Sequence, residues 1–223
     1  MNKNYDKLFT NGYTYFLKPT DQMELKGKLK KEEYNIYYPT KDSEKVIFYT
    51  NKKPEISLYE IKTNNVLRHQ DILGSLFNLG IEENTFGDII INDNHYYVFI
   101  LNLVEGYILS NFNKVGKYNI TLEKKDIDLL KDYERSYEKL EFVVTSTRID
   151  TVISRLVKGN RNTIKDLIKD KDILLNYKYL KDNSYKLKEN DIFSIRKHGK
   201  YKFIGVINTT KKDNLVIEIK KYV

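Results

Sequence analysis

Short apolar segments of two different periods alternate through the middle of the chain, and their order limits the folds that this stretch can adopt. Some segments alternate apolar and polar side chains with the period of a strand, and others place apolar side chains at helical spacing. In chain order they are 56–61 (strand), 68–79 (helix), 88–91 (strand), 96–101 (strand), 104–112 (helix) and 116–122 (strand). Gly80 follows the first helix, where we expect a left-handed backbone conformation.

The order β-α-β-β-α-β is that of the split βαβ or ferredoxin-like plan. RNA-recognition modules share this plan and stack bases on aromatic side chains of their sheet. Tyr59 on the first strand and Tyr97 or Phe99 on the third are candidates for such a face. Ordinary strand packing explains them at least as well, because the chain holds 19 tyrosines and this fold hosts many unrelated functions.

The flanking segments complete an α+β chain with three predicted domains. Pro19-Thr20-Asp21 predicts a helix start, with the helix running over residues 22–31, and residues 34–38 and 46–49 are strand-like. The highly charged residues 124–138 are typical of a linker or an exposed helix. The predicted divisions are a small N-terminal α/β domain (1–53), an RRM-like domain (54–123), a linker (124–141) and a basic C-terminal domain (142–223).

Charge is distributed unevenly along the chain. The 39 Lys and Arg against 31 Asp and Glu give a net charge of +8. Residues 142–223 hold 19 basic and 9 acidic residues, whereas residues 1–141 hold 20 and 22. A basic end of this kind favours a polyanionic partner such as nucleic acid over a merely solvated lysine-rich surface.

The composition argues against several other classes of protein and of functional site. The chain has no cysteine, which excludes disulfides, thiolate nucleophiles and Cys-based zinc sites. Its three histidines, His69, His95 and His198, are far apart in sequence, so we expect no metal site. No apolar run reaches the roughly 18 residues that a membrane span needs. The N-terminus has no apolar stretch typical of a secretory signal, so we expect a cytoplasmic protein without cofactors.

Residues 148–176 predict two short helices and a strand. Gly159 ends the first helix, and Asn160 is a suitable N-cap for the second. On the second helix Arg161, Lys165 and Lys169 are spaced i, i+4, i+8 and so form one stripe beside the apolar face. This layout is typical of a helix that packs inward and contacts phosphate on its outer side. Strands are expected over 173–175, 191–196, 200–207 and 215–219.

The same segment resembles the S4 RNA-binding domain. The matching positions are Arg148-Ile149-Asp150, Asn160-Arg161-Asn162, Leu167-Ile168, Leu175-Asn176 and Asp191 to Arg196. Two features depart from the usual pattern. Asn replaces Ser on both sides of Arg161, and Asp170-Lys171-Asp172 stands where a glycine usually follows the second helix.

The resemblance extends upstream to the YlmH family of bacterial S4 proteins. The positions that resemble this family are residues 16–19, 68–76, 80–81, 86–89 and 113–116. The family's glycine-rich step is not visible near residues 37–45. The resemblance implies an RRM-like middle domain and a C-terminal S4 domain of the αL type. It also implies binding to structured RNA on the large (50S) ribosomal subunit and a role in rescue and quality control of stalled translation. We expect 23S rRNA and tRNA as the RNA partners and a monomeric protein.

The residues expected to bind RNA lie in the S4-like segment and at its strand ends. They are Arg148, Arg161, Lys165, Lys169, Asn176, Lys178, Arg196, Lys197 and Lys200. We predict no catalytic residue, because the single glycines at 80 and 87 make no nucleotide-binding loop. The alternatives are a small RNA-modifying enzyme, of the pseudouridine synthase or methyltransferase type, and a DNA-binding protein.

Overall fold

The computed structural model describes residues 3–222, which divide into two compact units, Met1–Glu134 (unit 1) and Arg135–Val223 (unit 2). Unit 1 contains both the N-terminal segment and the RRM-like segment, which the sequence predicts as separate domains. Within the described residues, no helix is both long and apolar enough to pass through a membrane.

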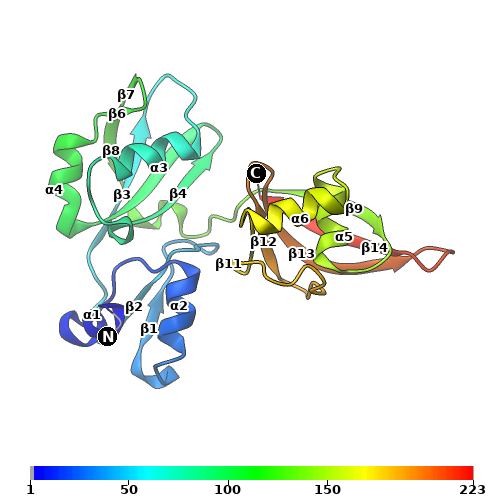
Figure 1. The fold of residues 1–223 in the computed structure, drawn as a ribbon. Coiled ribbons are helices and arrows are strands. Elements are labelled where there is room, and N and C mark those ends of the chain that lie inside the picture. The colour runs from blue at the N-terminus through cyan, green and yellow to red at the C-terminus, as the bar shows by residue number, and fades with distance from the viewer. Residues whose placement is uncertain (1–2, 223) are drawn as a thin grey trace. The chain divides into compact units, whose positions relative to one another are not determined.

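The N-terminal module of unit 1 is a pair of helices on a two-stranded sheet (Figure 1). Its elements are α1 (Lys3–Asn11), α2 (Pro19–Lys26), a 3₁₀ turn (Lys31–Glu33), β1 (Asn35–Tyr37) and β2 (Ile47–Tyr49). Pro19 begins α2 as predicted, but the helix ends at Lys26 instead of Lys31, since Gly27 caps it. Helix α1 was not predicted. Its buried residue Leu8 packs with Leu17 and Phe48 in a small core.

The RRM-like module has the predicted ferredoxin-like topology. Its principal elements are β3 (Ile56–Lys62), α3 (His69–Phe77), β4 (Phe86–Asn92), β5 (His95–Leu101), α4 (Asn102–Asn111) and β8 (Thr121–Lys125). The four strands form an antiparallel sheet in the order β4-β5-β3-β8. The fourth strand begins at Thr121 instead of 116, because Gly116 (φ +57°) turns a small hairpin of β6 (Lys114–Val115) and β7 (Tyr118–Asn119).

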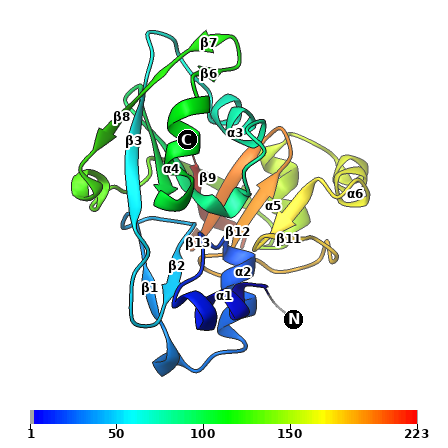
Figure 2. The same cartoon turned by 90° about the vertical axis from the view of Figure 1, so that its left-hand side faces the viewer.

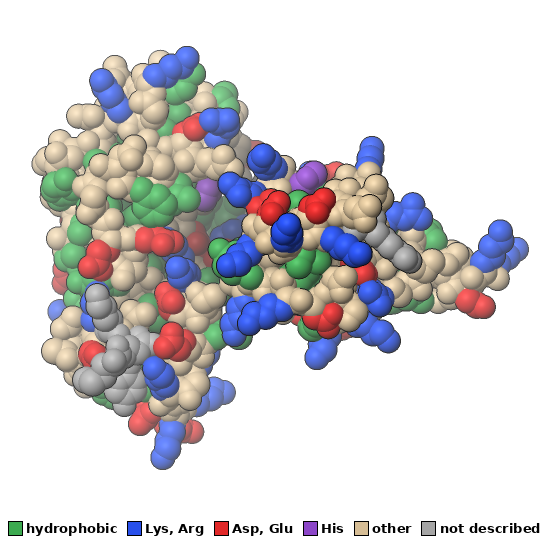
Figure 3. Space-filling view, viewed as in Figure 1, with side chains coloured by type: hydrophobic (Ala, Val, Ile, Leu, Met, Phe, Trp, Pro, Cys, Tyr) green, Lys and Arg blue, Asp and Glu red, His purple; other side chains and the backbone are tan. Residues whose placement is uncertain are grey.

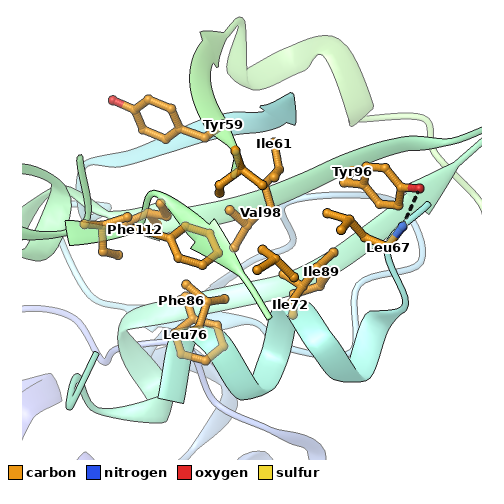
Figure 4. Close-up of a cluster of buried hydrophobic side chains, with 14 residues drawn as sticks. Tyr59, Ile61, Leu67, Ile72, Leu76, Phe86, Ile89, Tyr96, Val98 and Phe112 are labelled. Carbon is orange, nitrogen blue, oxygen red and sulfur yellow. Dashed lines mark hydrogen bonds between the residues drawn. The ribbon is translucent and has the colours of Figure 1, made fainter. Parts of the chain in front are cut away.

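Helices α3 and α4 cover one face of this sheet (Figures 1 and 2). Fully buried residues from the helices, such as Ile72 and Leu76, pack against Val98 of β5 and Phe86 of β4 (Figure 4). Tyr96 also faces this core, where its hydroxyl accepts a hydrogen bond of 2.9 Å from the Leu67 backbone N–H. The predicted periodicity therefore identifies the helical core correctly.

The opposite face of the sheet is covered by other parts of unit 1. Phe16 from the N-terminal module and Leu130 from the 3₁₀ turn Ile127–Leu130 pack with Phe99 and Tyr97 of β5. A Cβ atom at Gly87 would lie 2.9 Å from Cε1 of Phe16, so the ring rests directly on the β4 backbone. The N-terminal and RRM-like modules thus share a core.

Unit 2 is a six-stranded antiparallel sheet with two helices. Its elements are β9 (Tyr137–Val144), α5 (Ile149–Leu156), α6 (Arg161–Lys169), β10 (Ile173–Leu175), β11 (Lys178–Tyr179), β12 (Ile192–Ile195), β13 (Gly199–Thr209) and β14 (Leu215–Tyr222). The strand order is β11-β10-β12-β13-β14-β9. One core, which includes Val152, Ile164, Phe193 and Ile217, joins both helices to the sheet.

The structure has a strand, β9, where the sequence predicts the second part of a linker. Residues 124–141 contain the end of β8, a 3₁₀ turn and the first half of β9, which pairs with β14 from Tyr137↔Tyr222 to Val144↔Leu215. Leu140 and Phe142 of β9 pack against the core of unit 2. Unit 2 therefore starts near residue 135, before the predicted boundary at 142.

Gly80 adopts the left-handed conformation predicted for it, with φ +73°. No neighbouring atom lies within 4 Å of a Cβ built there, so the backbone conformation alone would penalise a side chain. We expect Gly80→Val to destabilise unit 1 by about 1–2 kcal/mol, since β-branched residues avoid positive φ. Thermal unfolding of the variant would check this, and an unchanged melting temperature would contradict it.

Candidate nucleic-acid interface

Helix α6 presents lysines on the side that faces away from the core. Asn160 caps the helix, because its Oδ1 accepts hydrogen bonds from the backbone N–H of Asn162 (2.9 Å) and Thr163 (3.0 Å). Ile164 is buried in the core, whereas Lys165 and Lys169 are exposed. Arg161 is the first residue of α6, and its side chain lies outside the described part of the chain. The predicted stripe is therefore confirmed at its two lysines.

The end of α6 brings further cations beside Lys169. The Arg196 guanidinium donates to Oδ1 of Asp172 at 3.2 Å, and its backbone N–H donates to the Asp172 carbonyl at 2.9 Å. This contact places the turn that carries Lys197 next to the helix exit. Lys171 lies there too, with φ +58° at the point where S4 domains usually have a glycine.

We call this group the α6 cation cluster: Lys165, Lys169, Lys171, Arg196 and Lys197. Lys171 was not predicted as a site residue, nor was the exposed Tyr179, whose ring centroid lies 5.8 Å from the Lys171 Nζ. Lys178 precedes Tyr179 on β11 and is also exposed. Lys and Arg side chains are spread over the side of unit 2 seen in Figure 3.

Two of the predicted RNA-binding residues have structural contacts instead of open side chains. The Asn176 amide donates to Oδ1 of Asp191 at 2.8 Å and accepts from the Ile192 N–H at 3.0 Å, which fixes the β10–β11 turn. Lys200 is half-buried, and its Nζ lies 4.8 Å from the ring centroids of both Tyr177 and Tyr222. Both residues therefore hold the sheet together near the cluster.

Arg148 precedes α5 and forms a paired contact with Asp150. Its Nε donates to Oδ1 at 3.1 Å and its Nη2 donates to Oδ2 at 2.7 Å. The Arg148 guanidinium holds the pKa of the Asp150 carboxyl below its usual range. Arg148 thus keeps a fixed orientation while 42% of its side chain remains exposed.

The aromatic residues of the RRM-like sheet do not form an open stacking face. Tyr59 points to the helical side, where its hydroxyl donates to Oε1 of Glu105 at 2.6 Å. Burial and this carboxylate raise the pKa of Tyr59 to about 12. Tyr97 and Phe99 lie on the opposite face, 9% and 0% exposed under the N-terminal module. Of the two explanations that the sequence leaves open for these three residues, their burial supports ordinary strand packing over base stacking.

The cations beside Tyr97 are paired within unit 1. Glu60, whose side chain is 4% exposed, lies 2.8 Å from Nζ of Lys62 and 3.1 Å from Nζ of Lys125. Burial alone would raise the pKa of Glu60, but hydrogen bonds from His95 and the two lysines outweigh it and lower the pKa to about 2. This part of the sheet is consequently a neutralised charge network.

Comparison with known proteins gives one family match in each unit. Residues 50–129 match the family model described as the putative RNA-binding domain in YlmH, and residues 147–193 match the S4 domain model. The chain is 25% identical to ribosome-associated protein quality control protein P2 of Bacillus subtilis, over 90% of this chain and 83% of that protein.

The chain is similar to the YlmH family in the segment of residues 50–129 and to this relative over most of its length. The solved structure of cell division protein ylmH from Streptococcus pneumoniae shares 25% identity over 59% of this chain and 90% of its own, with a TM-score of 0.46. The α+β architecture and the S4 domain that the sequence predicts are confirmed. The two matched domains support an RNA-binding role for this chain.

Proposed function

We propose that this protein binds structured RNA of the large ribosomal subunit, together with tRNA, and acts as a non-catalytic factor in ribosome-associated quality control. The observation that carries the proposal is the α6 cation cluster on an S4 domain, in a unit with 21 basic and 11 acidic residues. Backbone phosphates supply most of the affinity for such a surface. The name of the Bacillus subtilis relative supports the ribosomal setting.

In this proposal the protein works as a monomer in the cytoplasm. Unit 2 supplies most of the binding free energy, and unit 1, with 18 basic and 20 acidic residues, adds selectivity. Sedimentation of a cell lysate through a sucrose gradient tests the ribosomal part. Co-migration with 50S particles is expected, whereas protein found only at the top of the gradient at low salt would overturn the proposal.

The cluster itself makes a sharper prediction. Lys165→Ala together with Lys169→Ala is expected to weaken RNA binding and to lower the slope of log K against log salt by about two units, one for each lost phosphate contact. Both side chains are exposed, so folding should change by no more than about 0.5 kcal/mol each. Binding titrations at several salt concentrations would measure the slope.

The matched control is Lys30→Ala together with Lys31→Ala, which removes two exposed lysines from unit 1. We expect this pair to leave affinity and slope nearly unchanged. Equal losses from both double variants would show that binding is diffuse electrostatic attraction without a site on α6.

A further inference from the structure

A polar hollow opens on unit 2 beside the α6 cation cluster. Its volume is about 670 Å³, within the usual range of small-molecule sites. The residues that line it come from the segment between β9 and α5, from α5 itself, from the middle of α6 and from the loop before Leu187. They are Thr145, Ser146, Arg148, Asp150, Thr151, Ser154, Ile164, Lys165 and Asn183.

Three hydroxyl groups of this hollow, those of Ser146, Thr151 and Ser154, take part in internal hydrogen bonds. The Thr151 hydroxyl donates to Oδ1 of Asp150 at 3.3 Å, and the Ser154 hydroxyl donates to the Thr151 carbonyl at 2.8 Å. Oγ of Ser146 lies 3.4 Å from Oγ1 of Thr151. Either hydroxyl can donate in that contact, and Oγ of Ser146 also accepts from the Arg148 backbone N–H at 3.4 Å. With the Thr151 and Ser154 hydrogens on internal acceptors, this group of oxygens offers acceptor lone pairs to the hollow.

Two cations flank these acceptors. Arg148 uses two of its five N–H donors on Asp150, which leaves three for a ligand. Lys165 is exposed on α6 at the same hollow. Arg148 and Asp150 compensate each other's charge, so Lys165 gives the lining a net positive charge beside the acceptor oxygens.

A ribonucleotide has the complementary pattern, with an anionic phosphate and a sugar 2′-hydroxyl that can donate. A deoxyribonucleotide has the phosphate but lacks that donor. Resting on the proposed RNA binding, we propose that this hollow receives one ribonucleotide of the bound RNA and is where unit 2 distinguishes RNA from DNA. The phosphate lies against Arg148 and Lys165, and the 2′-hydroxyl donates to the oxygen cluster of Ser146, Thr151 and Ser154.

The test asks whether the 2′-hydroxyl donor itself, apart from the shape of the RNA, is recognised. The full chain is titrated with transcribed large-subunit rRNA and with the same transcript carrying 2′-fluoro in place of the 2′-hydroxyls, a group that cannot donate. The wild type is expected to bind ordinary RNA about three- to tenfold more tightly than 2′-fluoro RNA, because the 2′-fluoro transcript loses about one hydrogen bond. The double variant Ser146→Ala, Ser154→Ala should reduce this ratio toward one while keeping its affinity for 2′-fluoro RNA.

Ser110→Ala is the matched control, because its hydroxyl also bonds a helical carbonyl, that of Gly106 at 2.9 Å, but lies on α4 of unit 1. It should keep the wild-type ratio, and the melting temperature of each variant verifies its fold. Equal affinity of the wild type for ordinary and 2′-fluoro RNA would overturn the proposed role of the hollow, although RNA binding itself would stand. The same conclusion would follow if the double variant kept the wild-type ratio of these two affinities. Failure of the wild type to bind either transcript would overturn the proposed function as well.

Discussion

Replacing Phe99 with alanine is expected to destabilise unit 1 by about 3–5 kcal/mol, the usual cost of deleting a buried aromatic ring. Phe99 is 0% exposed and packs with Phe16 of the N-terminal module and Leu58 of the sheet. Since this core joins both modules, we expect the variant of the fragment 1–134 to unfold in one transition at a lower temperature. Calorimetry of that fragment, with and without the substitution, would measure the change.

Leu103→Ala is the control, because Leu103 is 54% exposed on α4 of the same module. We expect it to change the free energy of unfolding by no more than about 0.5 kcal/mol. Two separate transitions, only one of them lowered by Phe99→Ala, would show that the N-terminal and RRM-like modules fold independently. That result would contradict the shared core.

The sequence predicts the RRM-like topology well because each element has its own short-range signal. Helical spacing at Ile72 and Leu76, followed by the left-handed Gly80, identifies α3 without any knowledge of its neighbours. The packing of the N-terminal module over the other face of the sheet could not be predicted from such short-range signals. Tyr97 and Phe99 have the same pattern in a strand whether they stack on bases or are buried under Phe16.

Strand β9 shows a second limit. Its outward positions include Glu138 and Glu141, so the segment has the composition of a charged linker. Only pairing with β14, about 80 residues later in the chain, makes it a strand, as in the Lys221–Glu138 contact at 3.1 Å. Long-range pairing of this kind leaves no local signal.

Only part of the candidate site could be predicted, because contacts between distant segments leave no local signal in the sequence. Lys165 and Lys169 follow from helical spacing within one element. Lys171 and the hollow depend on contacts between elements, such as the bond from Arg196 to Asp172 across 24 residues. Asn176 was identified by its place in the S4 pattern, and the structure gives it hydrogen bonds that fix a turn.

Separating the units is expected to have the largest effect on RNA affinity. The fragment 135–223 has a net charge of +10 and carries the whole α6 cation cluster, whereas 1–134 has a net charge of −2. Because affinity grows with the number of neutralised phosphates, we expect 135–223 to bind RNA within about tenfold of the full chain and 1–134 to bind at least about 100-fold more weakly. Titrations of the three proteins at one salt concentration would measure both ratios.

The starting residue of the fragment matters to this comparison. A fragment that begins at 142 would lose Leu140 from the core and five of the eight β9 residues that pair with β14. We expect 142–223 to unfold at a lower temperature than 135–223 while keeping RNA affinity when folded, since the lost residues lie outside the cation cluster. RNA binding by 1–134 as tight as that of the full chain would contradict this division of roles, and would move the main binding surface to unit 1.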